Sequence, residues 1–293
     1  MRRWLSIARA TALEILSEPL SLLLLVTALA LATLAPAFHY HQFGEPTRMA
    51  RDAGMSALFT CGVLVAVFGV IKTFRREIET GTAQMALAHP VSRPMFFLSK
   101  VLGAVAAQLV VSTIVFLTCV TMVNGAAIGG VLAERTGDLA KVWGPSLALG
   151  VGTIILPLVA AAALNRFARW RFVLTFFFLA FLTALGGLGC RLDLSLGARL
   201  LPVAVLVLLL TLVFLTAAAA ASVRFRSNGA AASVGVLLAA SLPVIGNYYL
   251  PDALANGGVL PWSYVGLAAL VTAPAVVAFI VLGVHFFNGK DIG

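Results

Sequence analysis

The polar residues best able to do chemistry are concentrated in one segment, residues 72–94, between two long apolar runs. The segment carries the carboxylates of Glu77 and Glu79, the imidazole of His89 and several basic side chains. Nowhere in the chain do polar residues form the catalytic cluster that a membrane enzyme needs. We therefore interpret the segment as a water-exposed lever on which a cytoplasmic partner acts, and we expect no catalytic residues in this chain.

The residue order predicts a turn followed by a short helix inside this segment. Gly81 permits a tight turn, and Thr82 is a good capping residue for a helix over residues 83–88. Pro90 ends that helix because proline lacks the amide hydrogen that a further turn requires. The expected result is a short helix at the cytoplasmic surface, set between two membrane spans.

Two interpretations of this short helix fit the residue pattern. Met85, Leu87 and Ala88 give it an apolar stripe, and an apolar stripe in water favours a groove on a partner protein. Alternatively, the segment is an ordinary charged loop in which Arg75, Arg76 and Arg93 only fix the orientation of the neighbouring spans. The pattern alone leaves both interpretations open.

The composition is that of a membrane protein. Hydrophobic residues make up 61% of the 293 residues, charged residues only 11%, and the mean hydropathy is +1.04. Soluble domains usually carry about a quarter charged residues. Because no long polar stretch interrupts the chain, we predict a single transmembrane domain over residues 1–293.

The lengths of the apolar runs predict the transmembrane helices. A helix needs about 20 apolar residues to cross the hydrocarbon core of a bilayer. We predict an all-α, polytopic transmembrane helical bundle with eight spans, or six if one pair of runs is re-entrant. The runs cover residues 20–38, 54–71, 96–123, 145–164, 172–189, 200–222, 229–247 and 264–287.

The net charge of +9 follows membrane topology rather than nucleic-acid binding. With a cytoplasmic N-terminus, the inside segments hold 14 of the 20 Lys and Arg and 5 of the 11 Asp and Glu, a net +9. The outside loops hold 6 of each, a net zero. We therefore predict that both termini are cytoplasmic and that nucleic acid is not a partner.

A separate helix is predicted before the first span. Residues 1–18 carry apolar side chains at helical spacing and basic side chains elsewhere, and Pro19 follows directly. Such a helix favours the membrane interface, and the proline separates it from the span.

The histidines and cysteines give no strong metal or disulfide site. His39 and His41 supply two ligands, whereas a usual zinc site needs about four. Cys61 and Cys119 lie in apolar runs and are typical small core residues, and neither forms a C-x-x-C pair with Cys190. We predict no metal, no cofactor and no disulfide in this chain.

The predicted spans carry few polar side chains at their centres. Gln108, Asn124 and His285 occur there, but no mid-span Asp, Glu, Lys or Arg. Transporters coupled to protons or ions usually need such residues. The pattern therefore argues against a secondary transporter.

The polar segment resembles a known family. The run Glu-Ile-Glu-Thr-Gly-Thr from Glu77, and the run Ala-His-Pro-Val-Ser-Arg that ends at Arg93, resemble the segment after the second span of type-2 ABC transporter permeases. The N-terminal amphipathic helix and the overall length also fit that family, although its common architecture has six spans. The resemblance implies a permease subunit of an ATP-driven exporter in a bacterial cytoplasmic (inner) membrane, with a coupling helix within residues 72–94.

The resemblance also implies the partners and the contact residues. Two copies of a separate ATPase subunit bind ATP and Mg²⁺, and two permease chains form a homodimer or a related heterodimer in the lipid bilayer. The sequence fits this division because it contains no G-x-x-x-x-G-K-[ST] motif. An alternative is an assembly or mechanotransmission subunit that couples the ATPase to an extracytoplasmic partner without transporting a substrate. The implied ATPase-coupling residues are Glu77, Glu79, Gly81, Thr82, Met85, Leu87, His89, Pro90 and Arg93.

Overall fold

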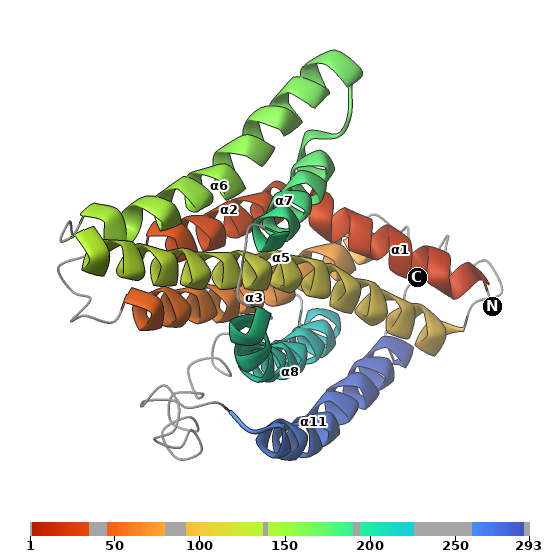
Figure 1. Cartoon of the computed structure of the whole chain (residues 1–293). Coiled ribbons are helices and arrows are strands. Elements are labelled where there is room, and N and C mark those ends of the chain that lie inside the picture. The colour runs from red at the N-terminus through yellow and green to blue at the C-terminus, as the bar shows by residue number, and fades with distance from the viewer. Residues whose placement is uncertain are drawn as a thin grey trace. The chain divides into compact units, whose positions relative to one another are not determined.

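The structure, a computed structural model, describes residues 2–34, 46–79, 92–136, 140–189, 194–225 and 260–289. Every regular element in these ranges is a helix and none is a strand, which confirms the all-α prediction for this part of the chain (Figure 1). The predicted span over residues 229–247 lies outside the described residues. The helices are α1 (Arg2–Ser17), α2 (Pro19–Leu34), α3 (Pro46–Glu79), α5 (Arg93–Thr136), α6 (Ala140–Ala168), α7 (Phe172–Gly189), α8 (Leu194–Arg224) and α11 (Trp262–Asn288).

Among the described residues, five helices are long and apolar enough to cross a membrane: α3, α5, α6, α8 and α11. A sixth candidate is the pair α1 and α2, if the two are counted as one span bent by 62°. Helix α7 is apolar but shorter, with an apolar stretch over Phe172–Gly187. The predicted count of eight or six spans therefore stays a prediction.

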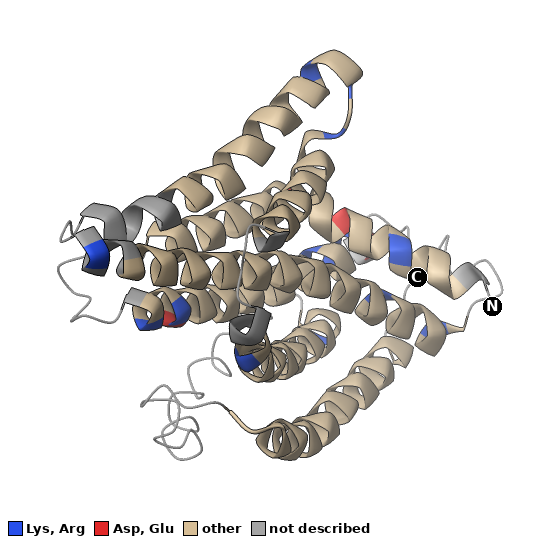
Figure 2. Cartoon of the chain, in the orientation of Figure 1, with Lys and Arg blue, Asp and Glu red and all other residues tan. Residues whose placement is uncertain are grey.

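The charged residues of the long helices lie near the helix ends (Figure 2). Helix α3 has no Asp, Glu, Lys or Arg over residues 53–71, and α5 has none over residues 101–133. Helix α11 has none at all. Because a charge at the centre of a bilayer is costly, this distribution is typical of membrane-spanning helices.

The chain divides into two compact units that are not consecutive in sequence. Unit 1 comprises Met1–Ser21, Gly62–Leu109 and Val205–Gly293, and unit 2 comprises Leu22–Cys61 and Val110–Ala204. Helices α3, α5 and α8 each contribute residues to both units. The division therefore does not separate sequential domains.

Helix α1 ends where the sequence predicts. Glu18 and Pro19 follow its last residue, and α2 begins at the proline, which fits the first turn of a helix because its missing amide hydrogen is not needed there. We call residues 14–21, the end of α1 and the start of α2, the elbow. The predicted separate helix over residues 1–18 is confirmed, while its position at a membrane interface stays a prediction.

Glycines bring α1 close to α3 and α5 within unit 1. A Cβ atom on Gly103 of α5 would lie 2.3 Å from the carbonyl oxygen of Ala8 and 2.8 Å from Cβ of Thr11. A Cβ atom on Gly69 of α3 would lie 3.0 Å from Cγ2 of Ile15. Ala8, Thr11 and Ile15 share the buried face of α1, at helical spacing. The α1 helix is therefore packed directly against the backbones of both neighbours.

Each unit has its own apolar core. In unit 1, Phe97 packs against Phe74 and Phe287, with ring centroids 5.3 Å and 6.4 Å away. In unit 2, Cys119 belongs to a buried cluster with neighbours from α3 and α8. Cys61 and Cys119 are buried free cysteines, which confirms that both are core residues.

Candidate functional site

Six charged residues gather in unit 1 where α1, α3 and α5 meet. The group has three carboxylates and three cations, so its formal charges balance. We call it the elbow cluster, and it consists of Glu14, Glu18, Lys72, Arg76, Glu77 and Lys100.

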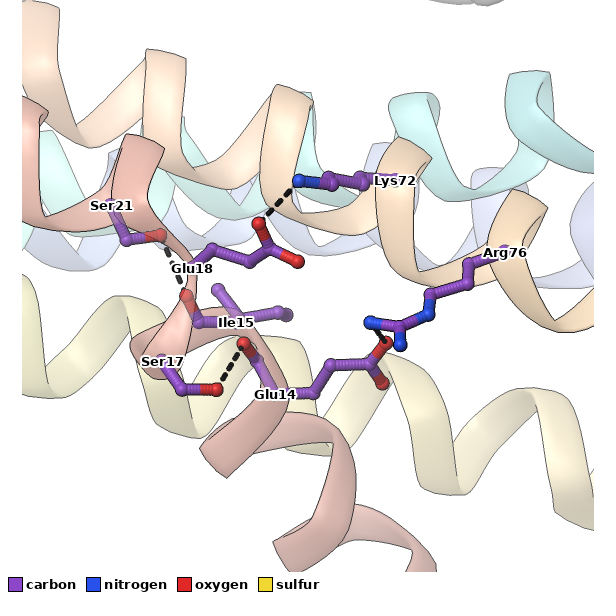
Figure 3. Close-up of polar contacts among 7 residues, drawn as sticks. All are labelled: Glu14, Ile15, Ser17, Glu18, Ser21, Lys72 and Arg76. Atoms are coloured by element: carbon purple, nitrogen blue, oxygen red, sulfur yellow. Dashed lines mark hydrogen bonds and ion pairs between the residues drawn. The ribbon is translucent and has the colours of Figure 1, made fainter. Parts of the chain in front are cut away.

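Two ion pairs attach the end of α3 to the elbow (Figure 3). Lys72 Nζ donates to Oε2 of Glu18, and Arg76 Nη1 lies 3.7 Å from Oε1 of Glu14. Lys72 and Arg76 are more than half exposed, whereas the side chain of Glu18 is only 14% exposed. Exposed pairs of this kind contribute about 0–1 kcal/mol each, so they orient the elbow more than they stabilise it.

Hydrogen bonds within the elbow fix its geometry (Figure 3). Ser17 Oγ donates to the carbonyl oxygen of Glu14 at 3.0 Å, and Ser21 Oγ donates to that of Ile15 at 2.7 Å. The last carbonyl groups of a helix have no partner within the helix. The two serines satisfy two of these carbonyl groups, and the Ser21 bond ties the start of α2 to the end of α1.

The third ion pair is buried. Lys100 Nζ of α5 lies 2.7 Å from Oε1 of Glu77 of α3, and the Lys100 side chain is 0% exposed. The Glu77 side chain remains 26% exposed. Glu77 and Lys100 are therefore unequal partners, because only Glu77 reaches the surface.

Aromatic rings surround the buried ammonium group. Lys100 Nζ lies 5.6 Å from the ring centroid of Phe74 and 5.7 Å from that of Phe96. Both distances are within the range of cation–π attraction, which contributes about 0.5–2 kcal/mol. The pocket therefore holds the charge of Lys100 through one carboxylate and two ring faces.

Glu14 is the second acidic group near this ammonium. Burial raises the pKa of the Glu14 carboxyl, while the charges of Lys100 and Arg76 lower it and that of Glu77 raises it. The charges of Arg76, Glu77 and Lys100 therefore all act on the Glu14 carboxyl.

The elbow cluster flanks the predicted coupling helix in sequence. Glu77 precedes residues 80–91 and Lys100 follows them, so their ion pair ties together the two helix ends from which this segment leaves and returns. Arg93, at the start of α5, donates from Nη1 to the carbonyl oxygen of Asn288 at 3.1 Å. The start of α5 is thus also attached to the end of α11.

The structure describes two side chains among the predicted coupling residues. Glu77 is in the elbow cluster, and the exposed Arg93 contacts the end of α11. Glu79 is the last residue of α3, and nothing further is described of it. The remaining predicted coupling residues, Gly81, Thr82, Met85, Leu87, His89 and Pro90, lie outside the described residues.

The burial of Lys100 is a feature that the sequence did not predict. Lys100 is one of the 14 basic residues that the charge count places on the cytoplasmic side, and the structure buries its side chain completely. The sequence signal that could have indicated this burial is a single lysine among the apolar residues Phe96, Phe97 and Val101.

No group of three or more His, Cys, Asp or Glu in the described ranges is arranged to hold a metal ion. His39 and His41 lie outside those ranges. Comparison with protein families, with curated proteins and with solved structures found no match for this chain.

Proposed function

We propose that this chain is the membrane permease subunit of an ATP-driven exporter of the type-2 ABC transporter kind. In this proposal, the coupling helix predicted within residues 72–94 docks in a groove of a separate ATPase subunit, which binds ATP and Mg²⁺ and hydrolyses ATP. Two permease chains and two ATPase chains form the complex in the bacterial inner membrane, with both termini of this chain in the cytoplasm.

The observation that carries the proposal is the attachment of the polar segment to three helices. Glu77, within this segment, is paired with buried Lys100, so a push on the segment acts on α3 and α5 together. Lys72 and Arg76 pass the same displacement to the elbow, and hence to α1 and the start of α2. A flexible topology anchor needs none of these contacts.

The five long apolar helices support the membrane part of the proposal. Their uncharged central residues favour an apolar or amphiphilic cargo, or a cargo that leaves sideways through the bilayer, over a hydrated ion.

Substitutions in the apolar stripe test the docking. The tagged chain is purified in mild detergent from its own cells, and the bound ATPase subunit and its ATP hydrolysis are measured. Met85→Asp or Leu87→Asp places an unpaired charge in the proposed groove, which costs several kcal/mol and weakens ATPase binding at least about 100-fold. Gly81→Val weakens it by a second route, because valine strains the predicted turn.

A matched control uses the same new charge outside the stripe. Ala86→Asp, on the side of the same predicted helix opposite the stripe, is expected to keep the ATPase bound. Normal ATPase binding and transport by Met85→Asp and Gly81→Val variants would show that the segment is only a topology anchor.

A further inference from the structure

The turn between α6 and α7 is a strongly basic and aromatic surface. All seven residues from 165 to 171, which we call the basic turn, are exposed. They include Arg166, Arg169 and Arg171, and between these lie Phe167 and Trp170, which are 87% and 54% exposed.

The basic turn has a defined backbone. Asn165 Nδ2 donates to the carbonyl oxygen of Trp170 at 2.6 Å, which closes the turn. Arg169 has φ of 55°, a left-handed conformation that few residues other than glycine adopt. The amide and the hydroxyl of Thr175 both donate to the carbonyl oxygen of Arg171, at 3.0 Å and 2.9 Å. The three guanidinium groups are therefore presented by a fixed loop.

No acidic side chain neutralises these arginines in the part of the chain that the structure describes. Asp138 and Asp193 are the nearest acidic residues in sequence, and none lies between them. None of the three arginines forms an ion pair with a described carboxylate. Among the described residues, the turn thus presents three exposed positive charges with no acidic partner.

The surrounding helices place this charge at one depth. Residues 142–165 of α6 and 172–189 of α7 contain no Asp, Glu, Lys or Arg, and α6 is long and apolar enough to span a bilayer. The charges therefore begin where the apolar helices end, which is the level of the lipid headgroups. Exposed Phe167 and Trp170 fit the same level, because aromatic rings favour the membrane interface.

We propose that the basic turn binds the phosphate of an anionic phospholipid in the cytoplasmic leaflet. Arginine guanidinium groups bind phosphate oxygens in a bidentate manner, and the two rings lie against the glycerol and upper acyl region of the lipid. The rings distinguish this ligand from free phosphate, which has no apolar part. The proposal rests on the membrane part of the proposed function and does not depend on the ATPase.

Lipid binding by the purified full-length chain tests this. The delipidated protein in mild detergent is titrated with phosphatidylglycerol or phosphatidylcholine, and the bound lipid is counted by native mass spectrometry. The wild-type chain is expected to retain phosphatidylglycerol preferentially. Each arginine changed to glutamine weakens retention about fivefold, and the triple variant R166Q/R169Q/R171Q weakens it on the order of 100-fold.

Two further measurements separate binding from folding. The triple Arg→Lys variant keeps the charges that set topology but loses bidentate contacts, so it is expected to insert normally and to retain less lipid than the wild type. With the other three tryptophans changed to phenylalanine, Trp170 is expected to be quenched by brominated phosphatidylglycerol more than by brominated phosphatidylcholine.

Three results would overturn the proposal. The first is equal retention of phosphatidylglycerol by the wild type and by the triple glutamine variant. The second is competition by inorganic phosphate at concentrations equal to those of the lipid, which would assign the turn to a free anion. The third is a triple glutamine variant that retains as much lipid as the wild type but no longer binds the ATPase subunit. That result would assign the turn to a protein contact. If the wild-type chain retained phosphatidylglycerol but bound no ATPase subunit, the lipid site would stand and the proposed ATPase coupling would fail.

Discussion

The buried pair of Lys100 and Glu77 predicts that substitutions of its two members have unequal effects. Glu77→Ala leaves the ammonium of Lys100, which is 0% exposed, without its nearest counter-charge. Breaking a buried pair in this way costs about 3–5 kcal/mol of unfolding free energy. We expect the lower end of this range because the carboxylate of Glu14 also acts on Lys100.

The reverse substitution is expected to cost less. Lys100→Met keeps an unbranched apolar side chain among Phe74 and Phe96, and it leaves Glu77 with 26% of its side chain exposed to water. A partly hydrated group left without its partner costs about 1–3 kcal/mol. The double variant Glu77→Met with Lys100→Met leaves no charge of this pair unpaired and is expected to be more stable than Glu77→Ala.

The assay is unfolding of the detergent-solubilised chain by SDS, followed by tryptophan fluorescence. Lys72→Met is the matched control, since it removes a lysine that is 55% exposed from its pair with Glu18 and is expected to cost less than about 1 kcal/mol. A Glu77→Ala variant no less stable than the Lys72→Met variant would refute the role of burial. A larger loss of stability in the Lys100→Met variant than in the Glu77→Ala variant would also refute the role of burial.

Further predictions concern packing, topology and stoichiometry. Gly103→Ala introduces a Cβ atom 2.3 Å from the Ala8 carbonyl oxygen and is expected to lower the unfolding free energy by about 1–3 kcal/mol or more in the same SDS titration. Gly152→Ala, with no atom within 4 Å of its new Cβ, is expected to be neutral or stabilising by up to about 1 kcal/mol. Cysteines introduced at residues 138 and 252 are expected to react with a membrane-impermeant reagent in intact cells. Reaction only after permeabilisation would show that the predicted orientation is wrong. The mass of the purified active complex is expected to fit two permease and two ATPase chains, whereas an active complex with a single permease chain would contradict this.

Much of the helical architecture follows from the sequence because apolar length and proline position are local properties. Pro19 places the break between α1 and α2 correctly. The apolar runs nevertheless underestimate the helices, since α3 begins at Pro46 rather than at residue 54 and α5 continues to Thr136 rather than to residue 123. The predicted runs stop at the charged Arg51 and Asp52 in α3 and at the polar Asn124 in α5, whereas the helices themselves continue through these residues.

The elbow cluster could be predicted only in part. The sequence identifies Glu77 as an acidic residue that membrane orientation does not require. It does not show that its partner is Lys100, because the two residues lie on different helices and meet only through the packing of α3 against α5. Glu14 and Glu18 are likewise brought to Arg76 and Lys72 by the elbow rather than by a sequence motif.

Cross-linking from the predicted coupling helix tests the central claim most directly. A photo-reactive amino acid at position 85 is activated in intact cells, and the cross-linked protein is identified by mass spectrometry, with position 252 as the control on the predicted outer side. The account predicts that position 85 captures a chain carrying the G-x-x-x-x-G-K-[ST] motif of an ATPase and that position 252 does not. If position 85 captured no such chain in cells where the protein is inserted and active, this result would contradict the account.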